Sequence, residues 1–169
     1  HRGYFCFEVG YFLKVLQKNY FDTIYHEHLD YHHASPLVKY LLSIGFSIVS
    51  ITTNKIQGGT LRILCKKNNI VRLYAQPKKF LVKENNTVIN NFDFLTNWPN
   101  RINQNMIQLN KVVMGYYKEK KNIVGYGAPT KATLILKMSK MSKNIITKII
   151  EDNDLKAGKY MPKTNIKII

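Results

Sequence analysis

Residues 21–31 bring several groups that can transfer protons close together in the sequence. These groups are Tyr25, His26, Glu27, His28 and Tyr31. Histidine titrates near neutral pH, and a carboxylate beside it can fix its tautomer or raise its pKa. A tyrosine hydroxyl can donate a hydrogen bond to a developing oxyanion. Together they could remove a proton next to a carbonyl group and stabilise the enolate that forms.

The spacing of the two histidines also allows less specific interpretations. His26 and His28 are two positions apart, so in an extended segment they share one side and Glu27 takes the other. Surface clusters of His and Glu are common, and His is the commonest metal ligand. A pair of this spacing without a cysteine partner or an HExxH pattern is weak evidence for zinc. Spacing therefore leaves catalysis and a structural role open, and we assign no metal ligands.

A second candidate site is the turn Gly125-Tyr126-Gly127-Ala128-Pro129-Thr130-Lys131. Glycines at the start of a β-α-β unit let backbone amides approach a phosphate at the N-terminus of the helix. Thr130 stands where the dinucleotide fingerprint has its third glycine, so the pattern alone is weak. Lys131 would add a cation, and Asp152 could accept a hydrogen bond from a ribose hydroxyl. The alternative is a tight turn followed by a solvated strand end.

A third segment, Gly58-Gly59-Thr60-Leu61-Arg62, has two interpretations of equal weight. Arg62 could bind a phosphate or carboxylate through two parallel hydrogen bonds. It could equally form a structural ion pair, and the two glycines could serve only to allow a close backbone approach.

These segments, in this order, resemble the sugar-nucleotide C-methyltransferase family. Residues 21–28 are similar to its Tyr-His-Glu-His signature, residues 58–62 to its Gly-Gly-Ser-Leu-Arg strand, and residues 125–131 to its Gly-Tyr-Gly-Ala-Pro-x-Lys turn. Residues 152–162 resemble its closing segment. The matches extend over nearly the whole chain. It departs from the family pattern at Gly10, Ala132, Lys163 and Lys167.

The resemblance implies transfer of a methyl group from S-adenosylmethionine to a carbon of a keto-sugar nucleotide. It implies that His28 is the general base, that Glu27 orients or hydrogen-bonds, and that Tyr25 faces the oxyanion or the sugar. Residues 125–131 and Asp152 would bind the nucleotide-diphosphate sugar. The family's methyl-donor loop and zinc-binding domain precede the matched region, so we expect the S-adenosylmethionine site to lie mostly upstream of His1. Zinc is expected only in that upstream domain, and the chain would be the C-terminal portion of a longer protein.

Three other functions remain as alternatives. The first is a non-catalytic module that only binds a nucleotide sugar, against which the complete Tyr25-His26-Glu27-His28 sequence argues. The second is a nucleic-acid-binding protein, suggested only by the net charge of +16. The third is an NAD-dependent oxidoreductase, which the missing third glycine disfavours.

Composition sets broader limits. A chain of 169 residues forms one large or two small domains, and 45% hydrophobic residues can bury a core. The lysines are scattered and no nucleic-acid motif is present, so we attribute the charge to compositional bias and predict neither a nucleic-acid nor a membrane partner. Cys6 and Cys65 lie in apolar runs and are expected to be buried thiols, which fits the cytoplasm. The oligomeric state is not predicted.

The elements that would position these sites form an α/β pattern. Strands are expected at residues 4–9, 46–53 and 60–66, with the last two antiparallel, and helices at residues 11–18 and 35–44. We interpret residues 1–70 as the C-terminal half of a Rossmann-type methyltransferase sheet. Residues 71–121 form a connecting segment, with a loop at 83–100 and then a helix. Residues 122–169 are a second, truncated Rossmann-like domain with a helix at 132–138 between strands near 122–124 and 145–150.

Overall fold

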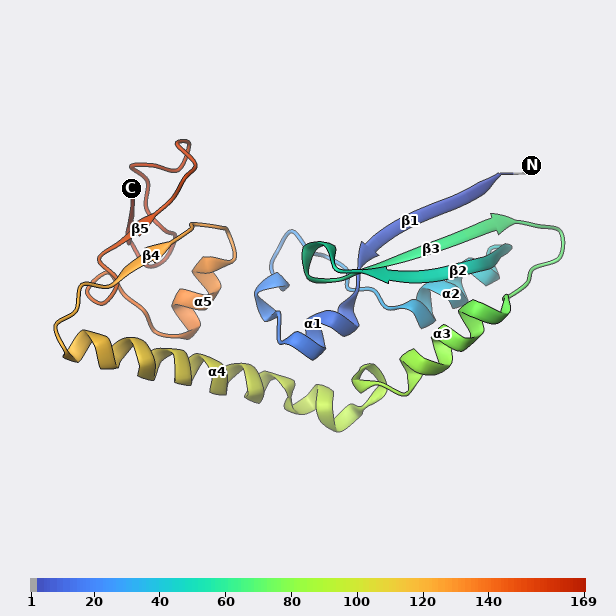
Figure 1. Cartoon of the computed structure of the whole chain (residues 1–169), viewed down its shortest axis with the longest axis horizontal. Helices are drawn as coiled ribbons and strands as arrows, with labels where there is room; N and C mark the ends of the chain where they lie inside the picture. Colours follow the sequence, from blue (N-terminus) through green and yellow to red (C-terminus); the bar gives the residue numbers. More distant parts are fainter. Residues whose placement is uncertain (1–2) are drawn as a thin grey trace. The chain divides into compact units, whose positions relative to one another are not determined.

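The computed structural model describes residues 3–169 and divides the chain into two compact units, His1–Trp98 and Pro99–Ile169 (Figure 1). Both units combine helices with a small sheet, which confirms the mixed α/β class. Each unit has its own hydrophobic core.

The sheet of the first unit contains β1 (Tyr4–Gly10), β2 (Phe46–Asn54) and β3 (Thr60–Lys67) in the order β1-β3-β2. The central strand β3 is antiparallel to both neighbours, which confirms the three expected strands and their antiparallel pair. Residues alternate between the two faces of a strand. On β3 the side chains facing the core are fully buried, namely Leu61, Ile63 and Cys65.

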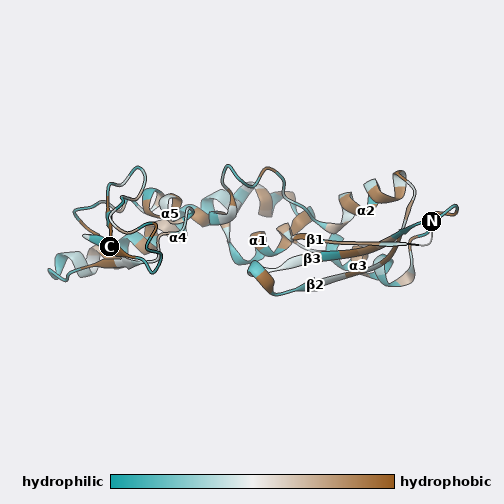
Figure 2. Ribbon diagram, turned by 90° about the horizontal axis from the view of Figure 1, so that it is seen from above, coloured by the Kyte–Doolittle hydropathy of each residue, from teal (hydrophilic) through white to brown (hydrophobic). Residues whose placement is uncertain are grey.

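Helices α1 (Phe12–Lys18), α2 (Ala34–Ser43) and α3 (Ala75–Asn85) complete the first unit, with short 3-10 helices at Phe21–Thr23, Ile56–Gly58 and Val88–Asn90. Their apolar residues pack on the core face of the sheet, and Figure 2 shows the hydrophobic stretches on the strands and helices. The structure confirms the expected helices at 11–18 and 35–44 to within a residue or two.

One expectation about the cysteines is wrong. Cys65 is buried, but Cys6 is exposed. Its neighbours Phe5 and Phe7 pair with Cys65 and Ile63 and therefore share the core face of the sheet. Cys6, between them, points to the opposite face.

The expected loop at residues 83–100 is also largely wrong. Helix α3 continues to Asn85, and α4 (Phe92–Lys118) begins only seven residues later, with Pro99 inside it. The side chain of Asn91 accepts a hydrogen bond from the Phe94 amide at 2.8 Å and so caps the start of α4. The Asn-rich sequence that suggested a loop therefore serves helix ends. The boundary between the two units falls within α4.

The second unit contains a parallel sheet of β4 (Val124–Tyr126), β5 (Lys148–Ile150) and β6 (Lys167–Ile168), in that order. Helix α5 (Ala132–Met138) connects β4 to β5, which confirms the expected β-α-β unit. The strand β6 was not expected. It is two residues long, too short for a periodic sequence signal.

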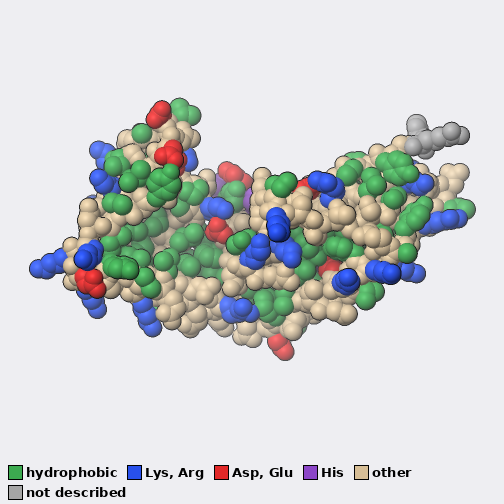
Figure 3. Space-filling model, in the orientation of Figure 1, with side chains coloured by type: hydrophobic (Ala, Val, Ile, Leu, Met, Phe, Trp, Pro, Cys, Tyr) green, Lys and Arg blue, Asp and Glu red, His purple; other side chains and the backbone are tan. Residues whose placement is uncertain are grey.

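Lys and Arg side chains are spread over the visible face of the chain (Figure 3). Within residues 3–169, no helix combines the length and the apolar character needed to cross a membrane.

Candidate active site

The segment with the two histidines connects α1 to α2 and is fixed at both ends. At its start, the Tyr20 amide donates to the Val15 carbonyl at 3.0 Å. At its end, the Phe12 amide donates to the His32 carbonyl at 2.8 Å. The residues between these anchors form a 3-10 turn at Phe21–Thr23 and then an exposed loop.

His28 makes a contact that defines its tautomer. Its Nδ1 lies 2.8 Å from the backbone carbonyl oxygen of Thr23. A carbonyl can only accept a hydrogen bond, so Nδ1 must carry the proton when the ring is neutral. The lone pair then resides on Nε2, and His28 is exposed. A neutral histidine held in this way has a free nitrogen that can take up a proton.

Two tyrosines lie beside His28. The ring of Tyr25 is 4.5 Å from the imidazole between centroids, and the Tyr31 ring is 6.5 Å away. The Tyr31 hydroxyl donates to the same Thr23 carbonyl at 3.2 Å, and its ring packs on Phe12 at 5.4 Å. Thus the structure brings together Tyr25 and His28, as the sequence suggested. It adds the Thr23 carbonyl, which has no signature because any residue type supplies it.

Unlike Tyr25, the side chain of Glu27 lies beside His26 and not beside His28. Its carboxylate lies 4.0 Å from Nε2 of His26, and these side chains are 61% and 81% exposed. The partner that orients His28 is the Thr23 carbonyl.

Arg62 forms a structural ion pair. Its Nη2 and Nε lie 2.7 Å and 2.8 Å from the Glu8 carboxylate, on the neighbouring strand. Hydrogen bonds from Thr60, Asn54 and Arg62 lower the pKa of Glu8 to about 2. Of the two interpretations of Arg62, the structure supports the ion pair.

The two glycines before Thr60 allow a close approach to α1. Both have positive φ, and a Cβ atom on Gly59 would lie 2.6 Å from Cγ of Lys14. A Cβ on Gly58 would lie 3.0 Å from the Tyr20 ring, next to the histidine segment. The pair therefore lets the β2–β3 connection pack where the candidate site begins.

The glycine turn of the second unit connects β4 to α5, as predicted. Gly127 has φ +84°, and its amide donates to the Ile150 carbonyl at 2.7 Å. A Cβ on Gly125 would lie 3.0 Å from Ile149. Ala128 is buried, while Pro129, Thr130 and Lys131 are exposed.

A carboxylate missed by the sequence analysis occupies this turn. The Ala128 amide donates to Glu151 at 2.6 Å, and this bond lowers the pKa of Glu151. Lys156 donates to both Glu151 and the Ala128 carbonyl, at 3.3 Å and 3.0 Å. An internal carboxylate therefore takes the amide that a bound phosphate would use. Glu151 directly follows β5, and this position could have indicated it.

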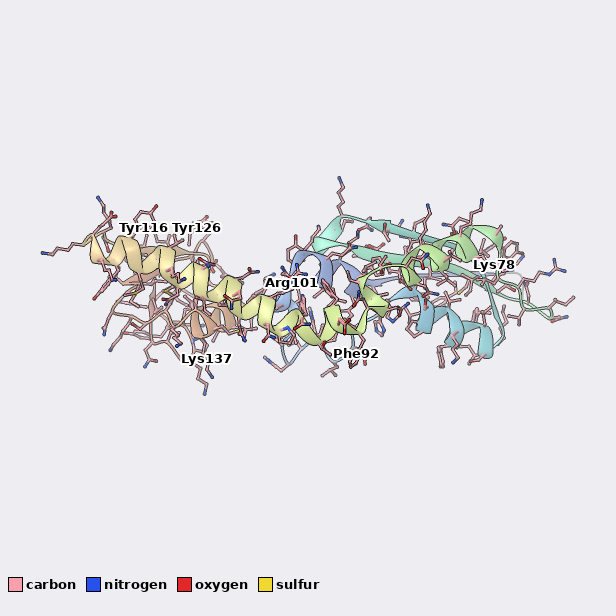
Figure 4. All side chains as sticks on the ribbon, turned by 90° about the horizontal axis from the view of Figure 1, so that it is seen from below. Lys78, Phe92, Arg101, Tyr116, Tyr126 and Lys137 are labelled. Carbon is pink, nitrogen blue, oxygen red and sulfur yellow. The ribbon has the colours of Figure 1, made fainter. Side chains whose placement is uncertain are left out.

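Asp152 accepts a short hydrogen bond from the Tyr126 hydroxyl, which raises the pKa of that hydroxyl. Tyr126 is 74% exposed, and Figure 4 shows it at the surface of the second unit. The pair presents a carboxylate and an aromatic ring to solvent. Within residues 3–169, no cluster of three or more His, Cys, Asp and Glu side chains is arranged to hold a metal ion.

Two comparisons with known proteins find relatives of this chain. The chain is 28% identical over 169 residues to the C-methyltransferase NovU of Streptomyces niveus, and the match covers 98% of this chain. The chain spans 40% of the length of that relative. A family model described as the C-methyltransferase C-terminal domain matches residues 55–169. The chain therefore belongs to the C-methyltransferase family.

Proposed function

We propose that this chain takes part in methylation of carbon in a keto-sugar nucleotide, with His28 as the general base. The observation that carries the proposal is the 2.8 Å contact between Nδ1 of His28 and the Thr23 carbonyl, which leaves Nε2 able to accept a proton. Carbon becomes a nucleophile only after a proton has left the position next to a carbonyl group, so the reaction needs such a base.

The residues around His28 suit the remaining requirements. Nε2 would take the alpha proton, and the electron pair of the broken C–H bond would move onto the carbonyl oxygen as an enolate. The Tyr25 hydroxyl would donate to that oxygen. The enolate carbon would then bond to the methyl group that S-adenosylmethionine would supply. The methyl–sulfur bond would break, and its electron pair would stay on the sulfur of the departing S-adenosylhomocysteine. None of the residues described above is assigned to the binding of that donor.

The glycine turn is proposed to bind the nucleotide diphosphate of the substrate. Because Glu151 occupies the Ala128 amide, phosphate contacts would fall on Thr130 and Lys131, the exposed residues just before α5. Asp152, held by Tyr126, would accept from a ribose hydroxyl through its other oxygen.

The fold is consistent with this role. We propose that the β1-β3-β2 sheet is the C-terminal part of a Rossmann-type methyltransferase sheet. The parallel β4-β5-β6 sheet would belong to a second Rossmann-like domain. The antiparallel strand β3 between β1 and β2 supports the assignment to a methyltransferase sheet. The β-α-β unit of β4, α5 and β5 supports the assignment to a Rossmann-like domain.

Replacing His28 by alanine in the full-length protein tests the proposal. Turnover should fall by roughly two to four orders of magnitude, and exchange of the substrate's alpha proton with deuterated solvent should stop with it. His26→Ala is the comparison variant: it removes an exposed imidazole that lies 4.0 Å from the Glu27 carboxylate and, between ring centroids, 6.0 Å from Tyr25. It leaves the contact of His28 with the Thr23 carbonyl in place, so turnover should fall far less and alpha-proton exchange should continue. Exchange at the wild-type rate in His28→Ala would remove His28 as the base and assign proton removal to another group. A full-length wild type that binds the nucleotide sugar without turnover or exchange would favour the binding-only module.

A further inference from the structure

One long stretch of the first unit is cationic and contains no acidic residue. Residues 31–83 have no Asp or Glu, although the chain has ten of them. The same stretch has nine Lys and Arg residues: Lys39, Lys55, Arg62, Lys66, Lys67, Arg72, Lys78, Lys79 and Lys83. A uniform compositional bias towards lysine does not by itself remove every acid from one stretch.

Three of these cations line one pocket. The end of β3 and the loop after it line an open, shallow pocket of about 490 Å³, with Lys66, Lys67, Arg72 and Tyr74 in the lining. Lys78 lies on α3 (Figure 4), one turn after Tyr74. Its amide donates to the Tyr74 carbonyl at 3.1 Å. The pocket therefore combines several positive charges with an aromatic side chain.

A buried serine holds the loop of this pocket in place. Ser47 is 0% exposed, and its Oγ accepts from the Asn68 side chain at 3.0 Å and from the Arg72 amide at 2.9 Å. The same hydroxyl donates to the Ile70 carbonyl at 3.3 Å. The Arg72 carbonyl in turn accepts from the Ile48 amide of β2 at 2.9 Å. The loop is thus ordered before any ligand arrives, which reduces the entropy cost of binding.

Contacts with aromatic rings also position the two lysines of the pocket. The ammonium nitrogen Nζ of Lys66 lies 5.6 Å from the centroid of the Tyr4 ring, and Nζ of Lys67 lies 5.0 Å from the centroid of the Phe46 ring. Among the described residues, none of the three pocket cations forms an ion pair with a carboxylate. Two carboxylates of the same unit are engaged elsewhere. Glu8 is paired with Arg62, and the buried Glu84 of α3 accepts from the first amides of α2.

We propose that this pocket binds a multiply charged phosphate group, of the kind found in pyrophosphate or a nucleoside diphosphate. Arg offers a planar set of donors that matches phosphate oxygens, and two fixed ammonium groups add charge. The site is separate from His28. The Gly58 end of the sheet contacts Tyr20, whereas Lys67 ends β3 roughly 23 Å away at the usual rise per residue.

Calorimetry on the full-length protein tests this proposal, with pyrophosphate as the probe. We expect saturable binding, weakened roughly tenfold to a hundredfold by Arg72→Ala, the range for loss of a charged hydrogen bond. Lys39→Ala is the matched control: it removes the same charge from the exposed side of α2 in the same acid-free stretch. The control should bind as the wild type does.

The outcomes separate specific binding from general attraction. No saturable binding, or equal weakening by Arg72→Ala and Lys39→Ala, would overturn the proposal. So would preferential binding of a single-stranded oligonucleotide that both substitutions weaken equally. Only binding that Arg72→Ala weakens reports on this pocket, because the glycine turn is proposed to bind a nucleotide diphosphate as well. In that binding, a nucleoside diphosphate that binds more tightly than pyrophosphate would assign the ligand to a nucleotide, and equal affinity would assign it to the phosphates alone. Arg72→Lys keeps the charge, so partial recovery of affinity supports the site and excludes misfolding as the cause.

Discussion

The Thr23 carbonyl oxygen receives hydrogen bonds from two side chains, Nδ1 of His28 and the hydroxyl of Tyr31. Both donors must point at one oxygen, so the imidazole has little freedom to flip and present Nδ1 to solvent. A histidine held in this way needs no neighbouring carboxylate to fix its tautomer. His28 is therefore oriented by the Thr23 carbonyl, although the Glu27 carboxylate lies beside His26.

Glu8 gives a prediction at the scale of one residue. Its folded pKa of about 2 lies below the ordinary glutamate pKa of 4.5, so its interactions contribute stability above pH 4.5. That contribution should be lost as the pH falls towards 2. Carboxyl-detected NMR should show a midpoint near pH 2, and Arg62→Met should raise it. A midpoint near 4.5 in the unmodified protein would mean that the Arg62, Thr60 and Asn54 contacts do not form in solution.

At the scale of elements, sequence patterns predicted those structures whose signal is local. The alternation of β3 and the apolar spacing of α2 are local, and both elements formed where expected. The start of α2 was predicted less well. It was expected at residue 35, but the helix begins at Ala34, and its first amides donate to Glu84 on α3. A contact between residues 50 positions apart leaves no periodic trace in the sequence.

A similar reason explains what was missed at the candidate sites. His28 and the glycine turn belong to contiguous motifs, and motifs can be recognised. The Thr23 carbonyl is backbone, and Glu151 reaches the Ala128 amide from the end of the next strand. The first contact is local but is made by a backbone carbonyl, which has no residue-type signal. The second joins residues 23 positions apart, and only the position of Glu151 directly after β5 could have indicated it.

The buried carboxylate of Glu84 provides a prediction for the α2–α3 contact. Glu84 is 2% exposed and accepts from the amides of Ala34 and Ser35 and from the Tyr11 hydroxyl, each at 2.8 Å. Burial alone would raise its pKa, but these bonds lower it. Glu84→Gln replaces one acceptor oxygen by a donor that faces other donors. We expect the free energy of unfolding to fall by about 1–3 kcal/mol in urea titrations.

Glu119→Gln is the control for Glu84→Gln, since Glu119 is exposed just after α4. It should leave the urea midpoint within error of the wild type. An equal midpoint for Glu84→Gln would show that the buried carboxylate is not needed to hold α2 on α3.

At the scale of the whole molecule, the chain has two hydrophobic clusters with no residue in common. One contains Leu61 and Ile63 of β3, and the other contains Ile166 and Ile168 near the C-terminus. The +16 charge is carried by both units, whereas the acid-free stretch of residues 31–83 lies in the first unit alone. A change in stability or in anion binding can therefore be assigned to one unit by a probe that lies within that unit.

The single tryptophan makes that separation possible. Trp98 packs against the first core, and its indole N–H donates to the Asn19 side chain at 3.0 Å, so its fluorescence reports on the first unit. Ile63→Ala should lower the unfolding free energy seen by Trp98 by about 2–5 kcal/mol, the usual cost of a core cavity. Ile166 is as fully buried as Ile63. Ile166→Ala should therefore lower the unfolding free energy of the second unit, followed by methyl NMR, by a similar amount and leave the Trp98 transition in place. A parallel loss of the Trp98 transition in Ile166→Ala would mean that the two clusters unfold as one cooperative core.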